Sequence, residues 1–320
     1  MNTTICTLFE RHYHFGVAVL ANSLCASGFK GMIYAGFRGP LPPWAENEVD
    51  LIESGKWEME ISPEVRLVFL LLETPAHFTN YKPDFLLRIA EIAGTENDAL
   101  VYCDPDIVIT ETWQYFEDWL TCGVALCEDI NSPLPESHPR RIGWRRFFQP
   151  RGFTLRPRGA SYANGGFIGL RPQDRKLLPI WRDMLTSAGD ALGGKDVVGI
   201  QGGRTLDGLY GFADCLRKTD QDTLNAALEA CPEVEVSFLG PQAMGFLLGG
   251  AILPHALGPA KPWQRRYLAE ALGGLPPAHV DKAFWHHASG PIKPFGPAWL
   301  ALKKLSLTAS AALGRFIRRT

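Results

Sequence analysis

The stretch Val101-Tyr-Cys-Asp-Pro-Asp-Ile-Val-Ile109 predicts a buried β-strand that ends by presenting two carboxylates, Asp104 and Asp106. Apolar and β-branched residues flank the acidic pair on both sides, which disfavours a solvated acidic loop. Residues two apart in an extended chain point to the same side. A pair placed in this way suits a hard divalent cation bound to a diphosphate. Two solvated acids at a strand end fit the pattern too, so the motif alone leaves both interpretations open.

The first 35 residues set the fold class. Ile5 to Phe9 is typical of a strand, Gly16 to Leu24 of a helix packed on a sheet, and Gly31 to Ala35 of a second strand. This order predicts a doubly wound α/β fold with a central, mostly parallel sheet and helices on both faces. No Gly-x-Gly-x-x-Gly occupies the first turn, which disfavours NAD and FAD.

Composition restricts the classes of protein. The chain has 320 residues, 46% of them hydrophobic, and a formal net charge of −2, so no global attraction to nucleic acid is expected. Seven cysteines without a Cys-x-x-Cys favour reduced thiols and a cytoplasmic location. We also expect no signal peptide and no membrane-spanning segment.

An unusual segment, residues 138–158, mixes arginines with aromatic residues, proline and glycine. We expect a long mobile loop there, either solvated or closing as a lid over an anionic or sugar substrate. Nucleic-acid binding through this segment is the third interpretation, and it predicts a strongly salt-dependent affinity.

Three later motifs contain side chains suited to catalysis or ligand binding. Asn164-Gly-Gly166 leads into a short apolar strand and allows a ligand to approach the backbone. Asp220-Gln-Asp222 opens a helix, where Asp220 also suits a helix cap. His287-Ala-Ser-Gly-Pro-Ile-Lys-Pro-Phe295 supplies an imidazole that can complete a metal site and a lysine that can neutralise phosphate.

Residues 297–320 predict a basic amphipathic tail. It is interpreted either as a packed terminal helix or as a peripheral contact with the cytoplasmic face of a membrane.

Four pieces occur in one order: a first strand followed by Tyr13, Asp-x-Asp, Asp-Gln-Asp, and His-x-x-Gly-x-x-Lys-Pro-aromatic. In this the chain resembles the retaining glycosyltransferases with the GT-A fold, in particular family 8, the glycogenin and lipopolysaccharide galactosyltransferase family. Phe295 departs from the family's usual Trp. The resemblance covers most of the chain, except residues 130–160 and 190–215.

The resemblance implies roles for individual residues. Asp104, Asp106 and His287 would hold Mn²⁺ (or Mg²⁺), and Lys293 would contact the phosphates of a UDP-sugar donor. Thr7, Leu8 and Tyr13 would cradle the base, and Lys82, with Arg88 as the alternative, would contact the donor. Asn164, Gly165 and Gly166 would line the sugar pocket. Asp220, Gln221 and Asp222 would sit on the reactive face of the sugar, with Gln221 or Asp222 the candidate group beneath the anomeric carbon.

The resulting hypothesis is a metal-dependent, retaining hexosyltransferase. It would use UDP-galactose or UDP-glucose and a glycan acceptor such as a surface polysaccharide or a lipid-linked glycan. Residues 1–296 would form one catalytic domain, with its nucleotide half at about 1–130 and its sugar half at about 131–296. A non-catalytic scaffold that binds sugar nucleotides is the alternative, and a nucleotidyltransferase fits the Asp-x-Asp motif alone.

Overall fold

The computed structural model describes residues 1–194, 196 and 215–314. In these residues one sheet has the strand order β3-β4-β5-β2-β1-β6-β8-β7-β9. The strands are β1 (Thr3–Glu10), β2 (Gly31–Arg38), β3 (Asp50–Glu53), β4 (Lys56–Ser62), β5 (Val65–Leu71), β6 (Ala99–Cys103), β7 (Val124–Glu128), β8 (Ala163–Leu170) and β9 (Val236–Leu239). The helices are α1 (His14–Ala26), α2 (Lys82–Ala93), α3 (Trp113–Leu120), α4 (Pro139–Phe148), α5 (Leu177–Leu192), α6 (Thr219–Ala230), α7 (Tyr267–Leu272), α8 (His279–His287) and α9 (Pro297–Leu313).

The predicted α/β class with a central sheet is confirmed. The pairs β1–β6, β2–β5 and β7–β9 are parallel. The pairs β3–β4, β4–β5, β6–β8 and β7–β8 are antiparallel. The chain divides into two compact units, each assembled from three segments. Unit 1 comprises residues 1–8, 72–103 and 116–241, and unit 2 comprises residues 9–71, 104–115 and 242–320. The predicted domain boundaries stay a prediction.

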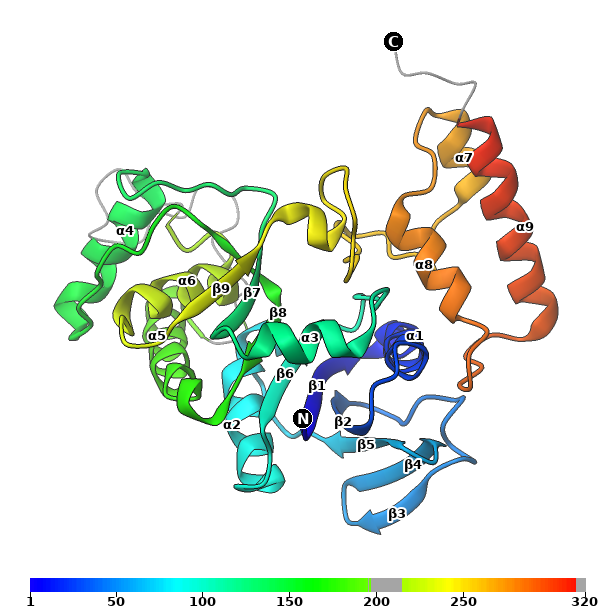
Figure 1. Cartoon of the computed structure of the whole chain (residues 1–320), viewed down its shortest axis with the longest axis horizontal. Coiled ribbons are helices and arrows are strands. Elements are labelled where there is room, and N and C mark those ends of the chain that lie inside the picture. The colour runs from blue at the N-terminus through cyan, green and yellow to red at the C-terminus, as the bar shows by residue number, and fades with distance from the viewer. Residues whose placement is uncertain (195, 197–214, 315–320) are drawn as a thin grey trace. The chain divides into compact units, whose positions relative to one another are not determined.

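Unit 1 is built around fully buried strands. Every residue of β6 and β8 is buried, which fits their nearly continuous apolar sequences. Helices α2, α5 and α6 pack on one another beside these strands (Figure 1). Trp181 of α5 is fully buried, and its indole donates to the backbone oxygen of Asp220 at the start of α6 over 3.1 Å. Packing therefore fixes the end of α6 that carries the Asp-Gln-Asp motif.

The prediction of a mobile loop at residues 138–158 is wrong, because the first half of this segment forms the helix α4 of unit 1. The His138 ring caps this helix by accepting from the backbone amide of Arg140, and Pro139 takes the first turn. Arg141 is almost fully buried and its guanidinium lies 3.0 Å from the Glu229 carboxylate of α6. A guanidinium buried in this way needs its carboxylate partner, so the pair holds α4 against α6.

Unit 2 has its own aromatic core. Trp263, Phe284 and Trp285 pack with Val19 of α1, and Leu300 and Leu307 of α9 lie against this cluster. Helices α7, α8 and α9 follow one another at the C-terminal end (orange to red in Figure 1), and α9 packs on α7.

The predicted tail therefore includes a packed helix, α9. The opposite side of α9 is exposed at Trp299, Leu302 and Leu305. Arg315, Arg318 and Arg319 of the tail lie outside the described residues. Among the described helices none is long and apolar enough to cross a membrane. All seven cysteines are free thiols, five of them buried.

Candidate functional site

The Asp-x-Asp pair follows directly after β6, as the sequence predicts. The extended backbone expected through Asp104 and Asp106 is wrong, because the chain turns there and the amide of Ile107 donates to the oxygen of Asp104 over 3.0 Å. Asp106 is buried and Asp104 is half-buried. Gly16 of α1 packs against this turn: a Cβ at residue 16 would lie 2.1 Å from the Pro105 carbonyl oxygen. Only glycine fits, so α1 and the acidic turn are held in close contact.

A third ligand-type side chain completes the cluster. His255 Nε2 lies 3.3 Å from Asp106 Oδ1 and 3.8 Å from Asp104 Oδ2. One ligand atom from each of the three residues falls within 4.8 Å of the others, and they form the one such group in the described part of the chain. Two carboxylates and an imidazole are a donor set that Mn²⁺ accepts, and Mg²⁺ favours the two carboxylates. The residues therefore fit the metal that the sequence implies.

A buried lysine adjoins the same carboxylates. Lys261 Nζ lies 2.6 Å from Asp106 Oδ2 and donates to the backbone oxygen of Ala256 over 2.7 Å. Burial alone would raise the pKa of Asp106, but His255 and Lys261 hold this pKa well below its usual value. Burial opposes the charge of Lys261, yet the Asp106 carboxylate raises the lysine's pKa. The site thus keeps a fixed cation beside the ionised Asp106 carboxylate.

The sequence-based interpretation passed over His255 and Lys261. The spacing of His287 to Phe295 occurs a second time, in His255-Ala-Leu-Gly-Pro-Ala-Lys-Pro-Trp263, and this copy ends in the tryptophan that Phe295 replaces. The structure brings the His255–Trp263 copy, not the His287–Phe295 copy, to the carboxylates. The terminal tryptophan was the signal that could have found it.

The other copy, His287–Phe295, lies along α1 instead. Asn22 donates to the backbone oxygens of His287 (2.9 Å) and Ile292 (2.8 Å) and accepts from the amide of Ile292 (2.9 Å). A Cβ at Gly290 would lie 2.5 Å from the Asn22 side chain, and Phe295 stacks on Phe15 with ring centres 4.7 Å apart. This segment is therefore fastened to α1 by its backbone and its aromatic ring.

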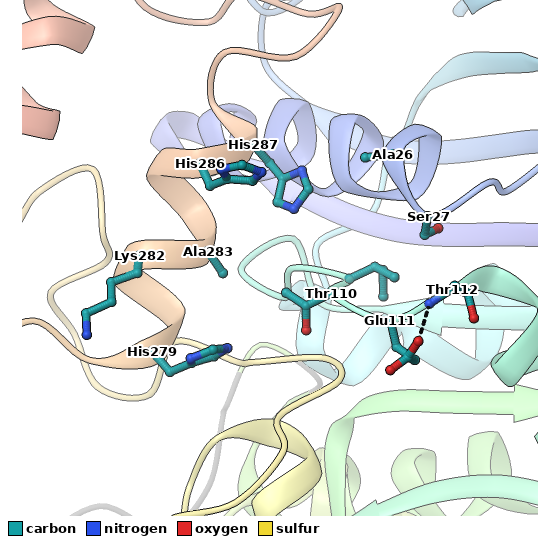
Figure 2. Close-up of a pocket in the computed structure, with 11 residues that line it drawn as sticks. Ala26, Ser27, Thr110, Glu111, Thr112, His279, Lys282, Ala283, His286 and His287 are labelled. Atoms are coloured by element: carbon teal, nitrogen blue, oxygen red, sulfur yellow. Dashed lines mark hydrogen bonds between the residues drawn. The ribbon is translucent and has the colours of Figure 1, made fainter.

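Figure 2 shows the pocket that His287 lines, a hollow of about 650 Å³. One side of the pocket is formed by α8, with His279, Lys282 and His286. Thr110 and Glu111 lie on the opposite side. Burial, with a smaller contribution from His286, lowers the pKa of His287 to about 4, so this imidazole is neutral at pH 7. Lys293 is exposed.

Aromatic rings gather around Tyr13 in unit 2. The 3₁₀ turn Arg11–Tyr13 places the His12 ring on the Tyr13 ring, with centres 4.8 Å apart. Trp263 donates to His12 Nδ1 over 3.0 Å and meets Tyr13 edge-on. Lys261 Nζ lies 5.9 Å from the Tyr13 ring. The segment His255–Trp263 thereby connects the acidic pair to the rings around Tyr13, which are predicted to hold a base.

Two residues predicted to join Tyr13 belong to unit 1. Thr7 and Leu8 lie in β1, and both are buried. The Thr7 hydroxyl has no hydrogen-bond partner among the described residues. A joint cradle for the base stays a prediction.

A second polar cluster, in unit 1, contains the other predicted residues. Lys82 is almost fully buried, donates to the Gly165 oxygen over 2.7 Å and pairs with Asp220 Oδ2 at 3.1 Å. The Gln221 side-chain oxygen accepts from the Gly165 amide over 3.1 Å. The structure thus brings Lys82 into the cluster, whereas Arg88 is exposed on α2.

The glycine pair of β8 is held by its neighbours. Asn164 donates to Asp129 over 2.8 Å and accepts from the amide of Gly166 over 2.9 Å. A Cβ at Gly165 would lie 3.1 Å from Asp220 Oδ2. The absence of a side chain at Gly165 allows β8 and α6 to approach closely.

The three residues of the Asp-Gln-Asp motif differ in their surroundings. Asp222 is fully buried, accepts from the Tyr162 hydroxyl and the Lys218 amide, both over 2.8 Å, and lies 3.8 Å from Arg140. Burial, opposed by Arg140, raises the pKa of Asp222 to about 7. The Gln221 amide nitrogen is buried and has no partner among the described residues. Gln221 therefore retains a donor for a ligand, whereas both oxygens of Asp222 are engaged by the protein.

Several solved glycosyltransferases are similar to the chain. The galactosyltransferase LgtC, solved in complex with donor and acceptor sugar analogs, is 15% identical, with 93% of this chain and 99% of that chain covered and a TM-score of 0.49. The bifunctional glycosyltransferase WbbM is 14% identical over 96% of this chain and 52% of that chain, with a TM-score of 0.47. The glycosyltransferase GlyE of Streptococcus pneumoniae TIGR4 is 14% identical over 97% of this chain and 64% of that chain, with a TM-score of 0.49.

No protein-family model and no curated protein sequence matches the chain.

Proposed function

We propose that the chain is a glycosyltransferase that moves a hexose from a nucleotide sugar, UDP-galactose or UDP-glucose, to a glycan acceptor. The observation that carries the proposal is the cluster of Asp104, Asp106, His255 and Lys261 beside the aromatic rings of Tyr13 and Trp263. A base stacks on aromatic rings, and a diphosphate pairs with a divalent ion and a lysine, so the cluster has a group for each part of a nucleotide diphosphate.

Asp104, Asp106 and His255 would hold the divalent ion. When bound, it would supply positive charge to the diphosphate as the bond from sugar to phosphate breaks. Lys261 is already fixed by its bonds to Ala256 and Asp106, so its charge needs little reorganisation to stabilise the leaving phosphate.

The unit 1 cluster supports the sugar side of the proposal. Gln221 offers a buried amide N–H to a sugar oxygen, and Asp220 offers a carboxylate to an oxocarbenium-like centre. We propose that these two groups face the anomeric carbon with retention of its configuration. Asp222 would position α6 through Tyr162 and Lys218 rather than touch the sugar.

Metal-dependent donor binding tests the proposal. UDP-galactose, UDP-glucose, UDP-GlcNAc and GDP-mannose are titrated by calorimetry with and without Mn²⁺, and slow donor hydrolysis is followed in parallel. We expect one UDP-sugar to bind in a Mn²⁺-dependent manner. Asp104→Ala and His255→Ala should weaken this binding at least tenfold, since each removes a ligand of the ion.

The repeated sequence spacing supplies matched controls. His287→Ala and Lys293→Ala should leave donor affinity within about twofold of the wild type, while Lys261→Ala weakens it about tenfold, as expected when a charged hydrogen bond is lost. The reverse pattern would return the metal and phosphate roles to residues 287–295. Donor binding without hydrolysis or transfer to any acceptor would favour the non-catalytic scaffold. No nucleotide-sugar binding by the wild type would refute the proposal.

A further inference from the structure

A loop beside the unit 2 cluster carries three apolar residues, Phe246, Leu247 and Leu248, called the apolar tip below. Leu247 is 56% exposed and Leu248 is fully exposed, whereas Phe246 is half-buried. Gly245 and Gly249 flank the tip with φ of 73° and 151°, values that side chains rarely adopt. Adjacent exposed leucines beside a candidate site are suited to contact an apolar ligand or partner.

The apolar tip is attached to the residues of the candidate metal site. The Phe246 and His255 ring centres lie 6.0 Å apart. After the tip, the chain pairs with the segment that follows the Asp-x-Asp motif: Ala256 donates to the Asp106 oxygen over 3.1 Å, and Thr110 donates to the Ile252 oxygen over 2.9 Å.

The base of the loop is closed as well. The amide of Gly245 donates to the oxygen of Gln242 over 2.9 Å, and the amide of Ile252 donates to the oxygen of Ala243 over 3.0 Å. These bonds close the loop at its base, and the amide of His255 donates to the oxygen of Met244 over 3.0 Å, just before the loop. The tip is thus presented from a fixed base next to His255.

A nucleotide sugar has no part that matches this surface. Its base suits the rings of Tyr13 and Trp263, its diphosphate suits Lys261 and the carboxylates, and its sugar is polar. The other reactant that must reach the same cluster is the acceptor. Leucines recognise hydrocarbon and add no preference among bare saccharides.

We propose that the apolar tip binds a hydrocarbon aglycone of the acceptor, so that the acceptor is a sugar joined to an alkyl or isoprenoid chain. This inference rests on the proposed function. It specifies the acceptor as an amphiphile whose chain lies over Leu247 and Leu248 while its sugar approaches the metal cluster.

Binding of matched glycosides tests the inference. Methyl and n-octyl β-D-glycosides of glucose, galactose and mannose are titrated into the protein with Mn²⁺ and UDP, with the octyl compounds below their micelle concentrations. We expect the octyl form of at least one sugar to bind about tenfold more tightly than its methyl form, the gain from covering a few methylene groups.

The Leu247→Ser, Leu248→Ser double variant should reduce this preference to about twofold. Its affinity for the nucleotide sugar should not change, because neither leucine belongs to the metal cluster. Leu51 and Ile52 of β3 are similarly exposed, at 65% and 51%, so the Leu51→Ser, Ile52→Ser double variant is a matched control that should keep the preference.

Two results would overturn the inference: equal affinity of octyl and methyl glycosides for the wild type, or a preference that survives in the tip variant. Without an alkyl preference, self-association seen by ultracentrifugation and lost in the tip variant would assign the tip to a second copy. Binding to phosphatidylethanolamine and phosphatidylglycerol vesicles, lost in the same variant, would assign it to a bilayer. Failure of donor binding by the wild type would refute the proposed function separately, since the glycosides are titrated without donor sugar.

Discussion

Replacing Asp222 with asparagine should remove a large part of the pH dependence of stability. Burial raises the pKa of the Asp222 carboxyl group from 3.8 to about 7 in the folded chain. In the unfolded chain this carboxyl group has its ordinary pKa of 3.8. A folded state that binds its proton more tightly loses stability as the pH rises through that window. A pKa difference of this size corresponds to about 4 kcal/mol of unfolding free energy lost between pH 4 and pH 7, with little change above pH 7.

Urea unfolding at half-unit intervals from pH 4 to pH 8 measures the effect. The asparagine side chain introduced by Asp222→Asn would still accept from the Tyr162 hydroxyl, but it has one oxygen fewer, which leaves the Lys218 amide without its present acceptor. Asp222→Asn should therefore be about 1–2 kcal/mol less stable than the wild type near pH 4. It should equal or exceed the wild type above pH 7.

Asp190→Asn, which changes an exposed carboxylate of α5, serves as the control and should follow the wild-type curve. A wild-type minus Asp222→Asn difference that does not vary with pH would refute the reasoning.

Two other substitutions test how the clusters are held. Gly16→Ala would place a methyl group 2.1 Å from the Pro105 oxygen, so we expect a loss of about 1–3 kcal/mol in thermal unfolding and weaker Mn²⁺ binding by calorimetry. Gly250→Ala, where a Cβ meets no atom within 4 Å, should change neither, and equal effects would contradict the packing argument. Glu229→Gln leaves Arg141 buried without its ion-pair partner, so the free energy of unfolding measured in urea should fall by about 3–5 kcal/mol. A fall below about 1 kcal/mol would show that α4 does not depend on this pair.

Residues close together in sequence could be predicted well. Asp104 and Asp106 are separated by one residue and follow an apolar strand, so the local pattern was sufficient to place both carboxyl groups at a strand end. The choice between Lys82 and Arg88 depended on which face of α2 is buried. In the structure Lys82 is the buried residue of the two and bonds to Gly165 and Asp220, and its contact with the donor stays a prediction.

Residues brought together from distant parts of the chain could not be predicted in the same way. Arg141 and Glu229 are 88 positions apart, so the arginine-rich segment looked solvated although its partner lies in α6. His255 and His287 head two copies of the same spacing, and no local rule says which copy reaches the Asp-x-Asp turn. The contact depends on the pairing of residues 252–256 with residues 106–110.

The segmented make-up of the two units also has a consequence for how such a chain can evolve. The polypeptide passes from one unit to the other five times, at residues 8, 71, 103, 115 and 241. A recombination event with a related gene at any single point would leave at least one unit with segments of mixed parentage. New specificities in this chain are therefore expected to arise through point substitutions and changes in loops such as residues 245–250, rather than by exchange of whole units between genes.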